Sequence, residues 1–202
     1  MIPSLIERLL AVSASRPGRT ALRFEGEDWT YERLTAECRT LADRLEHAGA
    51  RGRRVGIDLP TGPEHVVALL AAAWAGATAV PFDEKWTQAQ VAARADLSAV
   101  TTVLHDDDGR IGLVPRANDS PSTPDSDVPF LLAATGGTSG VPKAVAIGAD
   151  ATLARFVTQT VDFGFSANTT FLSATPIFHG GGRSFILSQP GCADDHGVLA
   201  VS

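Results

Sequence analysis

The chain has 202 residues, of which 44% are hydrophobic and 20% charged, and its formal net charge is −6 at pH 7. This length suits one ordinary domain or two small ones, and the composition is typical of a folded globular protein rather than a disordered chain. The acidic balance argues against a nucleic-acid binder, which would carry a basic face. Cys38 and Cys192 are too few for a disulfide framework or a metal cluster, so we expect a reducing, cytoplasmic location. Neither a signal peptide nor a stretch of ~18 apolar residues is visible, so we expect no membrane partner.

The first 50 residues are predicted to form a helix, a hairpin and a second helix. A capping box at residues 4–7 starts the first helix, because a serine hydroxyl and a glutamate three residues later satisfy each other's backbone amides. The turn residues 25–26 lie between the segments 21–24 and 28–30, which predicts a short hairpin. After Thr30, apolar residues recur three or four positions apart, and Cys38 falls on this face as a small buried hydrophobe.

Strands and helices alternate over the next 50 residues. Strands are expected at 54–59, 78–82 and 101–104, with a helix over 64–75 that is apolar nearly all round and a shorter one after Thr87. A capping box at 61–64 is expected to start the first of these helices, and residues 87–90 are expected to open the second. This alternation indicates an α/β fold, with a mostly parallel sheet flanked by helices.

Residues 105–129 are polar and rich in Ser, Pro and Asp, and we interpret them as a surface connection within one domain spanning 1–202. His105 and the three aspartates after it could suggest a metal site. Consecutive loop residues cannot all converge on one ion, so a solvated turn is the better interpretation and no metal ligands are assigned.

A glycine-rich segment after residue 134 is the candidate binding site of this sequence. The apolar strand 130–134 runs directly into Thr135-Gly136-Gly137-Thr138-Ser139-Gly140-Val141-Pro142-Lys143. Glycines expose backbone amides, and three hydroxyls with one of only two lysines add further donors. Such a concentration of short donors suits a polyphosphate better than a plain flexible loop.

Other glycine-rich motifs fit this segment poorly. A Walker P-loop needs Gly-Lys-Ser/Thr, but Val141 follows Gly140. The dinucleotide-binding spacing is absent, and the hydrolase elbow Gly-x-Ser-x-Gly is missed by one position. An amidase-signature enzyme would need a lysine far upstream of its serines. The one candidate, Lys85, lies in a predicted loop that has no glycine-rich sequence around it.

The segment TGGTSGVPKAV resembles the signature loop of adenylate-forming (AMP-binding) enzymes, which include acyl- and aryl-CoA synthetases, luciferases and nonribosomal peptide adenylation domains. Ala144 departs from the glycine usual at its position. The similarity extends over residues 4–189, through the helix after Trp29-Thr30-Tyr31 and the passage 66–83. The segment 174–183, with Pro176, Phe178 and His179, resembles the P-x-F-H-x-x-G element of the CoA-ligase branch.

This resemblance implies a reaction in which a carboxylic acid attacks the α-phosphate of ATP and a thiol, usually that of CoA, then displaces AMP. It implies ATP, Mg²⁺ and CoA as cofactors, with Mg²⁺ carried on the phosphates. Lys143 would neutralise the phosphates or orient the loop, His179 would flank the acyl pocket, and Arg183 is either an anion contact or a solvated side chain. The residues implied as ligands of the β- and γ-phosphates are Thr135, Gly136, Gly137, Thr138, Ser139, Gly140 and Lys143.

The family's ribose-binding aspartate and catalytic lysine are not found in this sequence, and the tail 190–202 does not resemble the family's next strand. We therefore expect an incomplete, N-terminal portion of an acid–CoA ligase that is not competent alone, and no catalytic residue is assigned. A non-catalytic remnant that binds ATP or a partner, and adenylation for a carrier protein, are the alternatives. An open sheet edge would favour self-association.

Overall fold

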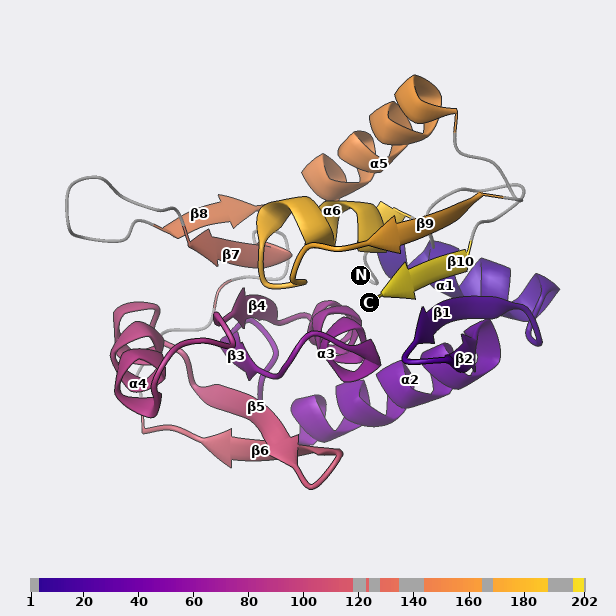
Figure 1. Cartoon of the computed structure of the whole chain (residues 1–202). Helices are drawn as coiled ribbons and strands as arrows, with labels where there is room; N and C mark the ends of the chain where they lie inside the picture. The colour runs from indigo at the N-terminus through magenta and orange to yellow at the C-terminus, as the bar shows by residue number, and fades with distance from the viewer. Residues whose placement is uncertain are drawn as a thin grey trace.

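The computed structural model describes residues 4–117, 123, 128–134, 144–164, 169–188 and 198–201. Helices and strands alternate along most of this length, as the sequence predicts (Figure 1). The elements are α1 (Ser4–Ser15), β1 (Thr20–Phe24), β2 (Glu27–Thr30), α2 (Tyr31–His47), β3 (Arg54–Asp58), α3 (Pro63–Trp74), β4 (Thr78–Pro81), α4 (Gln88–Leu97), β5 (Thr102–Asp107), β6 (Arg110–Pro115), β7 (Leu131–Ala134), β8 (Ala144–Ile147), α5 (Ala149–Phe163), β9 (Thr170–Ser173), α6 (Gly180–Ser188) and β10 (Val198–Val201).

A six-stranded sheet has the strand order β6-β5-β3-β4-β7-β8. Its four central strands are parallel, whereas β6 and β8 pair antiparallel with their neighbours at the two edges. Side chains alternate between the two faces of a strand, so Leu131 joins the core shared with α2 and α3 while Leu132 joins the core under α4. Helices therefore cover both faces, which confirms the predicted α/β class.

A second, four-stranded sheet has the order β2-β1-β10-β9. Strand β10 pairs parallel with both β1 and β9, although these two lie almost 150 residues apart in the chain. The part of the tail 190–202 that the structure describes is therefore a central strand. No local sequence pattern predicted this second sheet.

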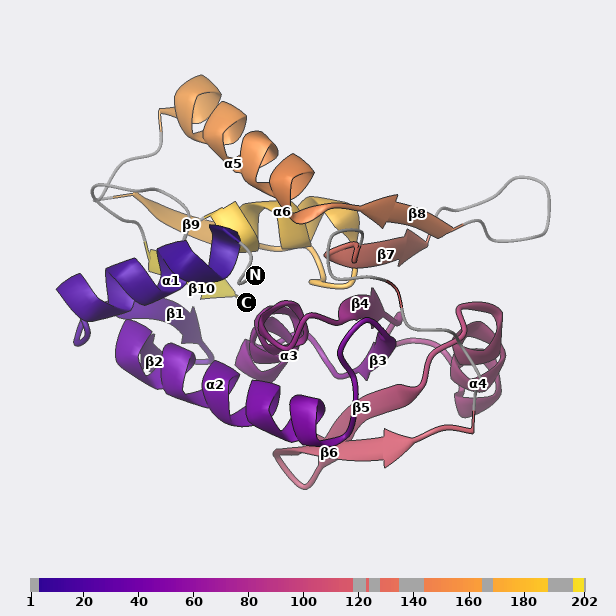
Figure 2. The same ribbon diagram turned by 180° about the vertical axis from the view of Figure 1, so that it is seen from behind.

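Helix α3 lies at the centre of the molecule in both opposite views (Figures 1 and 2). All its residues from 65 to 73 are buried, as its apolar sequence predicts. Four of these residues are alanines, and their small side chains allow α2 and the sheet to approach closely. Cys38 of α2 is fully buried against this helix, which confirms its role as a small core residue.

Two local predictions differ in outcome. The helix predicted to open at 87–90 is present, and Thr87 and Gln90 form a capping box with reciprocal bonds. The capping box predicted at Thr61 is wrong: Gly62 is the N-cap of α3 and makes no side-chain bond. The Thr61 hydroxyl instead accepts a hydrogen bond from the backbone amide of Ile177, 3.4 Å away, so a tertiary contact replaces the local one.

The predicted surface connection 105–129 begins with a hairpin. Strand β5 continues through His105 to Asp107, and β6 returns antiparallel to it. Asp108 and Gly109 form the turn, both with positive φ (50° and 79°), a conformation that glycine and aspartate tolerate well. The ring of His105 lies against Gly112, where any Cβ would come within 2.3 Å of it.

Candidate nucleotide-activation site

The carboxyl ends of the parallel strands β3, β4, β5 and β7 open at one edge of the six-stranded sheet. Ligands of open α/β sheets bind outside this edge. The predicted phosphate loop, residues 135–143, leaves the sheet here from Ala134 and re-enters it at Ala144, which is the strand partner of Ala134. The loop's own residues, including Thr138 and Lys143, lie outside the described part of the chain.

The flanking strands nevertheless constrain how this loop could hold a phosphate. A Walker P-loop joins a strand to a helix, so that the helix N-terminus faces the phosphates. Here the segment joins the two antiparallel strands β7 and β8. Any phosphate bound by the loop would depend on its amides, hydroxyls and Lys143 rather than on a helix dipole.

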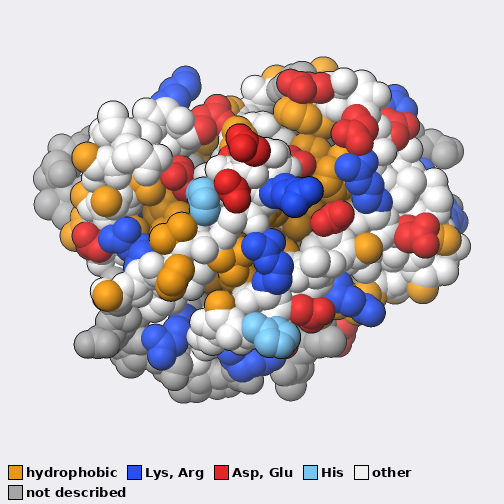
Figure 3. Space-filling view, turned by 90° about the horizontal axis from the view of Figure 1, so that it is seen from below, with side chains coloured by type: hydrophobic (Ala, Val, Ile, Leu, Met, Phe, Trp, Pro, Cys, Tyr) orange, Lys and Arg blue, Asp and Glu red, His pale blue; other side chains and the backbone are white. Residues whose placement is uncertain are grey.

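A cavity of about 510 Å³ lies at the same edge of the sheet, and its charged and histidine lining comprises Asp58, Glu84, His105, Asp106 and Arg116, whose guanidinium is paired with an aspartate of α4. Figure 3 shows hydrophobic, acidic and histidine side chains adjacent to one another on the face seen from below. Three carboxylates around one cavity would repel a triphosphate, so this cavity does not suit ATP phosphates. Among the described residues, no group of three His, Cys, Asp or Glu side chains could hold a metal ion.

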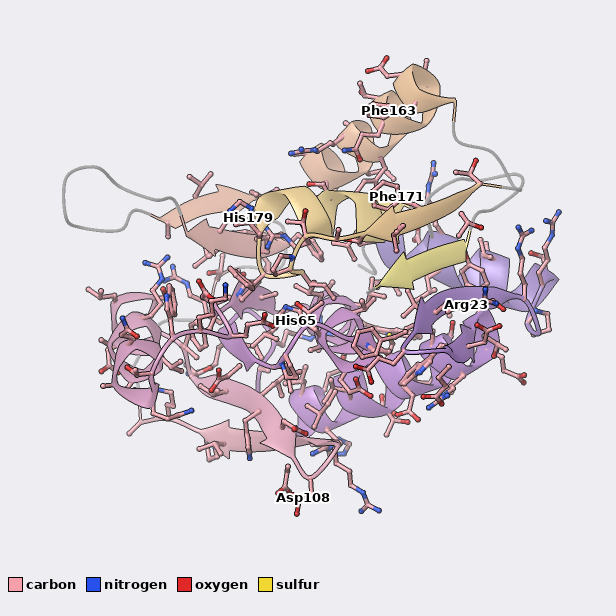
Figure 4. All side chains as sticks on the ribbon, viewed as in Figure 1. Arg23, His65, Asp108, Phe163, Phe171 and His179 are labelled. Carbon is pink, nitrogen blue, oxygen red and sulfur yellow. The ribbon has the colours of Figure 1, made fainter. Side chains whose placement is uncertain are left out.

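The segment between β9 and α6 contains His179, the other predicted site residue. His179 is exposed, directly before α6, and its ring lies edge-on to that of Phe178 with centroids 6.2 Å apart (Figure 4). Its backbone amide donates to Pro176 O at 3.0 Å, which closes a tight turn. Its backbone carbonyl accepts from Arg183 N at 3.1 Å, so the backbone is hydrogen-bonded on both sides of an exposed imidazole.

Arg183 fixes this turn from within α6. Its side chain is buried, with 4% exposed, and donates to the backbone carbonyls of Phe178 at 2.7 Å and Ile177 at 3.5 Å. No carboxylate among the described residues pairs with it. Burial, and then repulsion from Arg155, lowers the pKa of Arg183 to about 10. The interpretation of Arg183 as a solvated side chain is therefore wrong.

Gly182 allows α6 to lie directly on the same turn. A Cβ atom at this position would lie 2.3 Å from Thr175 O and 2.6 Å from Pro176 O, far inside van der Waals contact. By contrast, a Cβ at Gly181 would meet nothing closer than Thr175 Cγ2 at 4.0 Å. Of these two glycines of the His-Gly-Gly-Gly segment, Gly182 is the one that the packing requires.

His65 is a residue that the sequence analysis missed. It is 1% exposed at the start of α3, beneath α6 in Figure 4, and its Nδ1 lies 3.0 Å from Leu59 O. Burial lowers its pKa to about 4, and Arg183 opposes its protonation further. The sequence did contain a signal for this, namely a histidine within an otherwise apolar helix. A polar side chain on such a helix is buried with it, and a buried imidazole needs a specific hydrogen-bond partner.

The model for the AMP-binding enzyme family matches residues 10–117 of this chain. A 2-succinylbenzoate–CoA ligase of Bacillus cereus (strain AH820) is 25% identical over 186 residues, covering 86% of this chain and 39% of the relative. The uncharacterized acyl–CoA ligase YhfT of Bacillus subtilis (strain 168) is 26% identical over 179 residues, covering 80% and 37%. The chain thus spans about two fifths of the length of these curated relatives.

Solved structures share the fold. The o-succinylbenzoate CoA synthetase MenE of Bacillus subtilis, in complex with the acyl-adenylate intermediate OSB-AMP, matches 99% of this chain and 56% of its own, with a TM-score of 0.80 and 21% identity. The Klebsiella oxytoca NpsA N-terminal subdomain in complex with anthranilyl-AMSN matches 100% and 55%, with a TM-score of 0.80 and 23% identity. Within the described residues, no helix has both the length and the apolar character needed to cross a bilayer.

Proposed function

Because the chain belongs to the AMP-binding enzyme family, we propose that it contributes the phosphate-binding part of an ATP-dependent, AMP-forming acid–CoA ligase. In the first step a carboxylate oxygen attacks the α-phosphorus of ATP, forming an acyl-adenylate and releasing pyrophosphate. In the second, the CoA thiol attacks the acyl carbon and AMP leaves. The proposed partner is therefore a small carboxylic acid, with no nucleic acid and no membrane, in the cytoplasm.

The observation that carries this proposal is the segment TGGTSGVPK between β7 and β8, at the carboxyl edge of the parallel sheet. Its amides and the hydroxyls of Thr135, Thr138 and Ser139 would donate to the β- and γ-phosphates, and Lys143 would offset their charge. Mg²⁺, when bound, would neutralise phosphate charge. Water molecules and phosphate oxygens would supply most of its ligands. Gly136, Gly137 and Gly140 would let the backbone approach the phosphates closely.

His179 is proposed to flank the acyl pocket. The turn that Arg183 and Gly182 hold in place presents the imidazole at the surface directly before α6. We assign it a packing role against the acyl group and no proton transfer, since an aromatic edge suits an apolar chain. The P-x-F-H context favours CoA over a carrier protein as the acceptor.

We further propose that the 202-residue chain alone does not complete adenylation, because no residue of it is assigned to bind adenine or ribose or to act as the catalytic lysine. Losing a single transition-state donor costs ~10²–10³ in rate, and several would be missing together. ATP–pyrophosphate exchange with a panel of aliphatic and aromatic acids should therefore stay at background.

Calorimetric titration with Mg·ATP tests the proposal. Thr138→Ala and Lys143→Ala should each weaken binding by ~1–3 kcal/mol, the scale for losing a hydroxyl or charged donor. Lys85→Ala is the matched control, because Lys85 is the chain's only other lysine and is exposed after β4. Equal ATP affinity in all three variants and the parent chain would show that the loop does not bind the triphosphate. That result would favour the alternative that the chain is a non-catalytic remnant that binds a partner.

A further inference from the structure

A second cavity, of about 230 Å³, lies between α5, α6 and the β7–β8 pair. Figures 1 and 2 show α5 and α6 one above the other beside these strands. Its volume is several times the ~30 Å³ that one water occupies in the liquid, so it can hold a small organic molecule. The walls are largely apolar and include Leu131, Phe156 and Leu187.

Two guanidinium groups line this cavity, from Arg155 on α5 and Arg183 on α6. Neither forms an ion pair with a carboxylate in the part of the chain that the structure describes. They are close enough for the positive charge of Arg155 to lower the pKa of Arg183. Two like charges at one apolar cavity repel each other, and an anion placed between them would offset that repulsion.

The available donors select the type of anion. Thr152 and Ser184 also line the cavity, but each donates its hydroxyl proton to a carbonyl of the preceding turn, that of Gly148 or Gly180. Among the described side chains that line the cavity, the two guanidinium groups are the remaining donors, and Arg183 already gives its Nη1 to Phe178 O and Ile177 O. A guanidinium presents a planar pair of N–H groups that matches two oxygens of either a carboxylate or a phosphate. The largely apolar walls favour the carboxylate, because they can contact the hydrocarbon part of an organic acid and offer no further donors to a free phosphate.

We infer that this cavity binds the carboxylate of a small organic acid, with Arg155 and Arg183 at the carboxylate oxygens and the apolar walls around the rest of the ligand. The inference rests on the proposed function only in identifying this acid with the acid that is activated. For a substrate, the group bound here would be a second carboxylate, remote from the one that reacts with ATP.

Direct binding to the 202-residue chain tests this inference without requiring adenylation. Benzoate, phthalate and inorganic phosphate would be titrated separately, with chemical shifts or calorimetry as the readout. The organic acids should bind more tightly than phosphate, and Arg155→Gln should weaken them about 10-fold or more, as expected for a charge-assisted hydrogen bond. Arg155 is exposed, so this variant should fold.

Arg39→Gln is the matched control, since Arg39 is an exposed arginine of α2 that does not line the cavity. Arg183→Lys keeps the charge but loses the planar fork, and it should weaken binding as well. The inference is overturned if no organic acid binds, if phosphate binds as tightly as benzoate, or if Arg155→Gln and Arg39→Gln behave alike.

The same panel separates this inference from the proposed function. An acid that binds with Arg155 dependence and also supports pyrophosphate exchange, once a relative's remaining segment is supplied, is a substrate. An acid that binds with the same dependence but supports no exchange is a ligand of the cavity alone. Both results support the carboxylate site, and only the first supports the ligase.

Discussion

Replacing Gly182 by alanine tests how closely α6 lies on the turn that precedes His179. The added Cβ would lie 2.3 Å from Thr175 O and 2.6 Å from Pro176 O, and both are backbone atoms that cannot rotate away. The helix must therefore shift away from the turn, which also lengthens the bonds from Arg183 to Phe178 O and Ile177 O. Overpacking of this kind costs ~1–3 kcal/mol.

Alanine also favours a helix over glycine by up to ~1 kcal/mol, so Gly182→Ala alone would understate the steric cost. Gly181→Ala provides the matched control, because it receives a similar helical gain and its Cβ has no neighbour closer than 4.0 Å. The difference between the two variants isolates the clash. We expect Gly182→Ala to be less stable than Gly181→Ala by ~1–3 kcal/mol in urea unfolding. Equal stabilities would refute the close approach of α6 to the turn.

Two further predictions concern the core and the surface. The pKa of His65 is lowered from 6.5 to about 4 in the folded chain, so the unfolded state takes up the proton first and stability falls as pH drops from about 6.5 to 4. The loss should reach ~3 kcal/mol by urea unfolding, and His65→Phe should flatten this slope; an unchanged slope would contradict the assignment. On the surface, Val161 of α5 and Leu172 of β9 are 75% and 62% exposed, so we expect the chain to self-associate in light scattering. Val161→Lys should reduce this association relative to Glu32→Lys, an exposed position on α2, and a monodisperse parent chain would contradict the expectation.

Local sequence signals predicted the elements whose stabilising contacts are local. The helices predicted after Thr30 and Thr87 are present, and each threonine caps its helix through a partner three residues away. The same reasoning failed at Thr61, whose hydroxyl bonds to Ile177, 116 residues further along the chain. Strand β10 was missed for a similar reason, since its partners β1 and β9 are remote in sequence.

The same distinction between local and tertiary contacts applies to the candidate site. The predicted phosphate loop could be proposed from its residue types, because glycines, hydroxyls and a lysine occur together within nine positions. The cavity with Arg155 and Arg183 was not predictable, since it depends on how α5 packs on α6. Burial of His65 beside Arg183 likewise follows from tertiary packing rather than from spacing.

Titration of the 202-residue chain with Mg·ATP, pyrophosphate and AMP, in parallel, tests the central claim most directly. If the segment 135–143 holds the β- and γ-phosphates, Mg·ATP and pyrophosphate should both bind, and AMP, which lacks these phosphates, should bind at least ~10-fold more weakly. Lys143→Ala should weaken ATP and pyrophosphate binding equally. Binding of AMP as tightly as ATP, with no binding of pyrophosphate, would contradict the account.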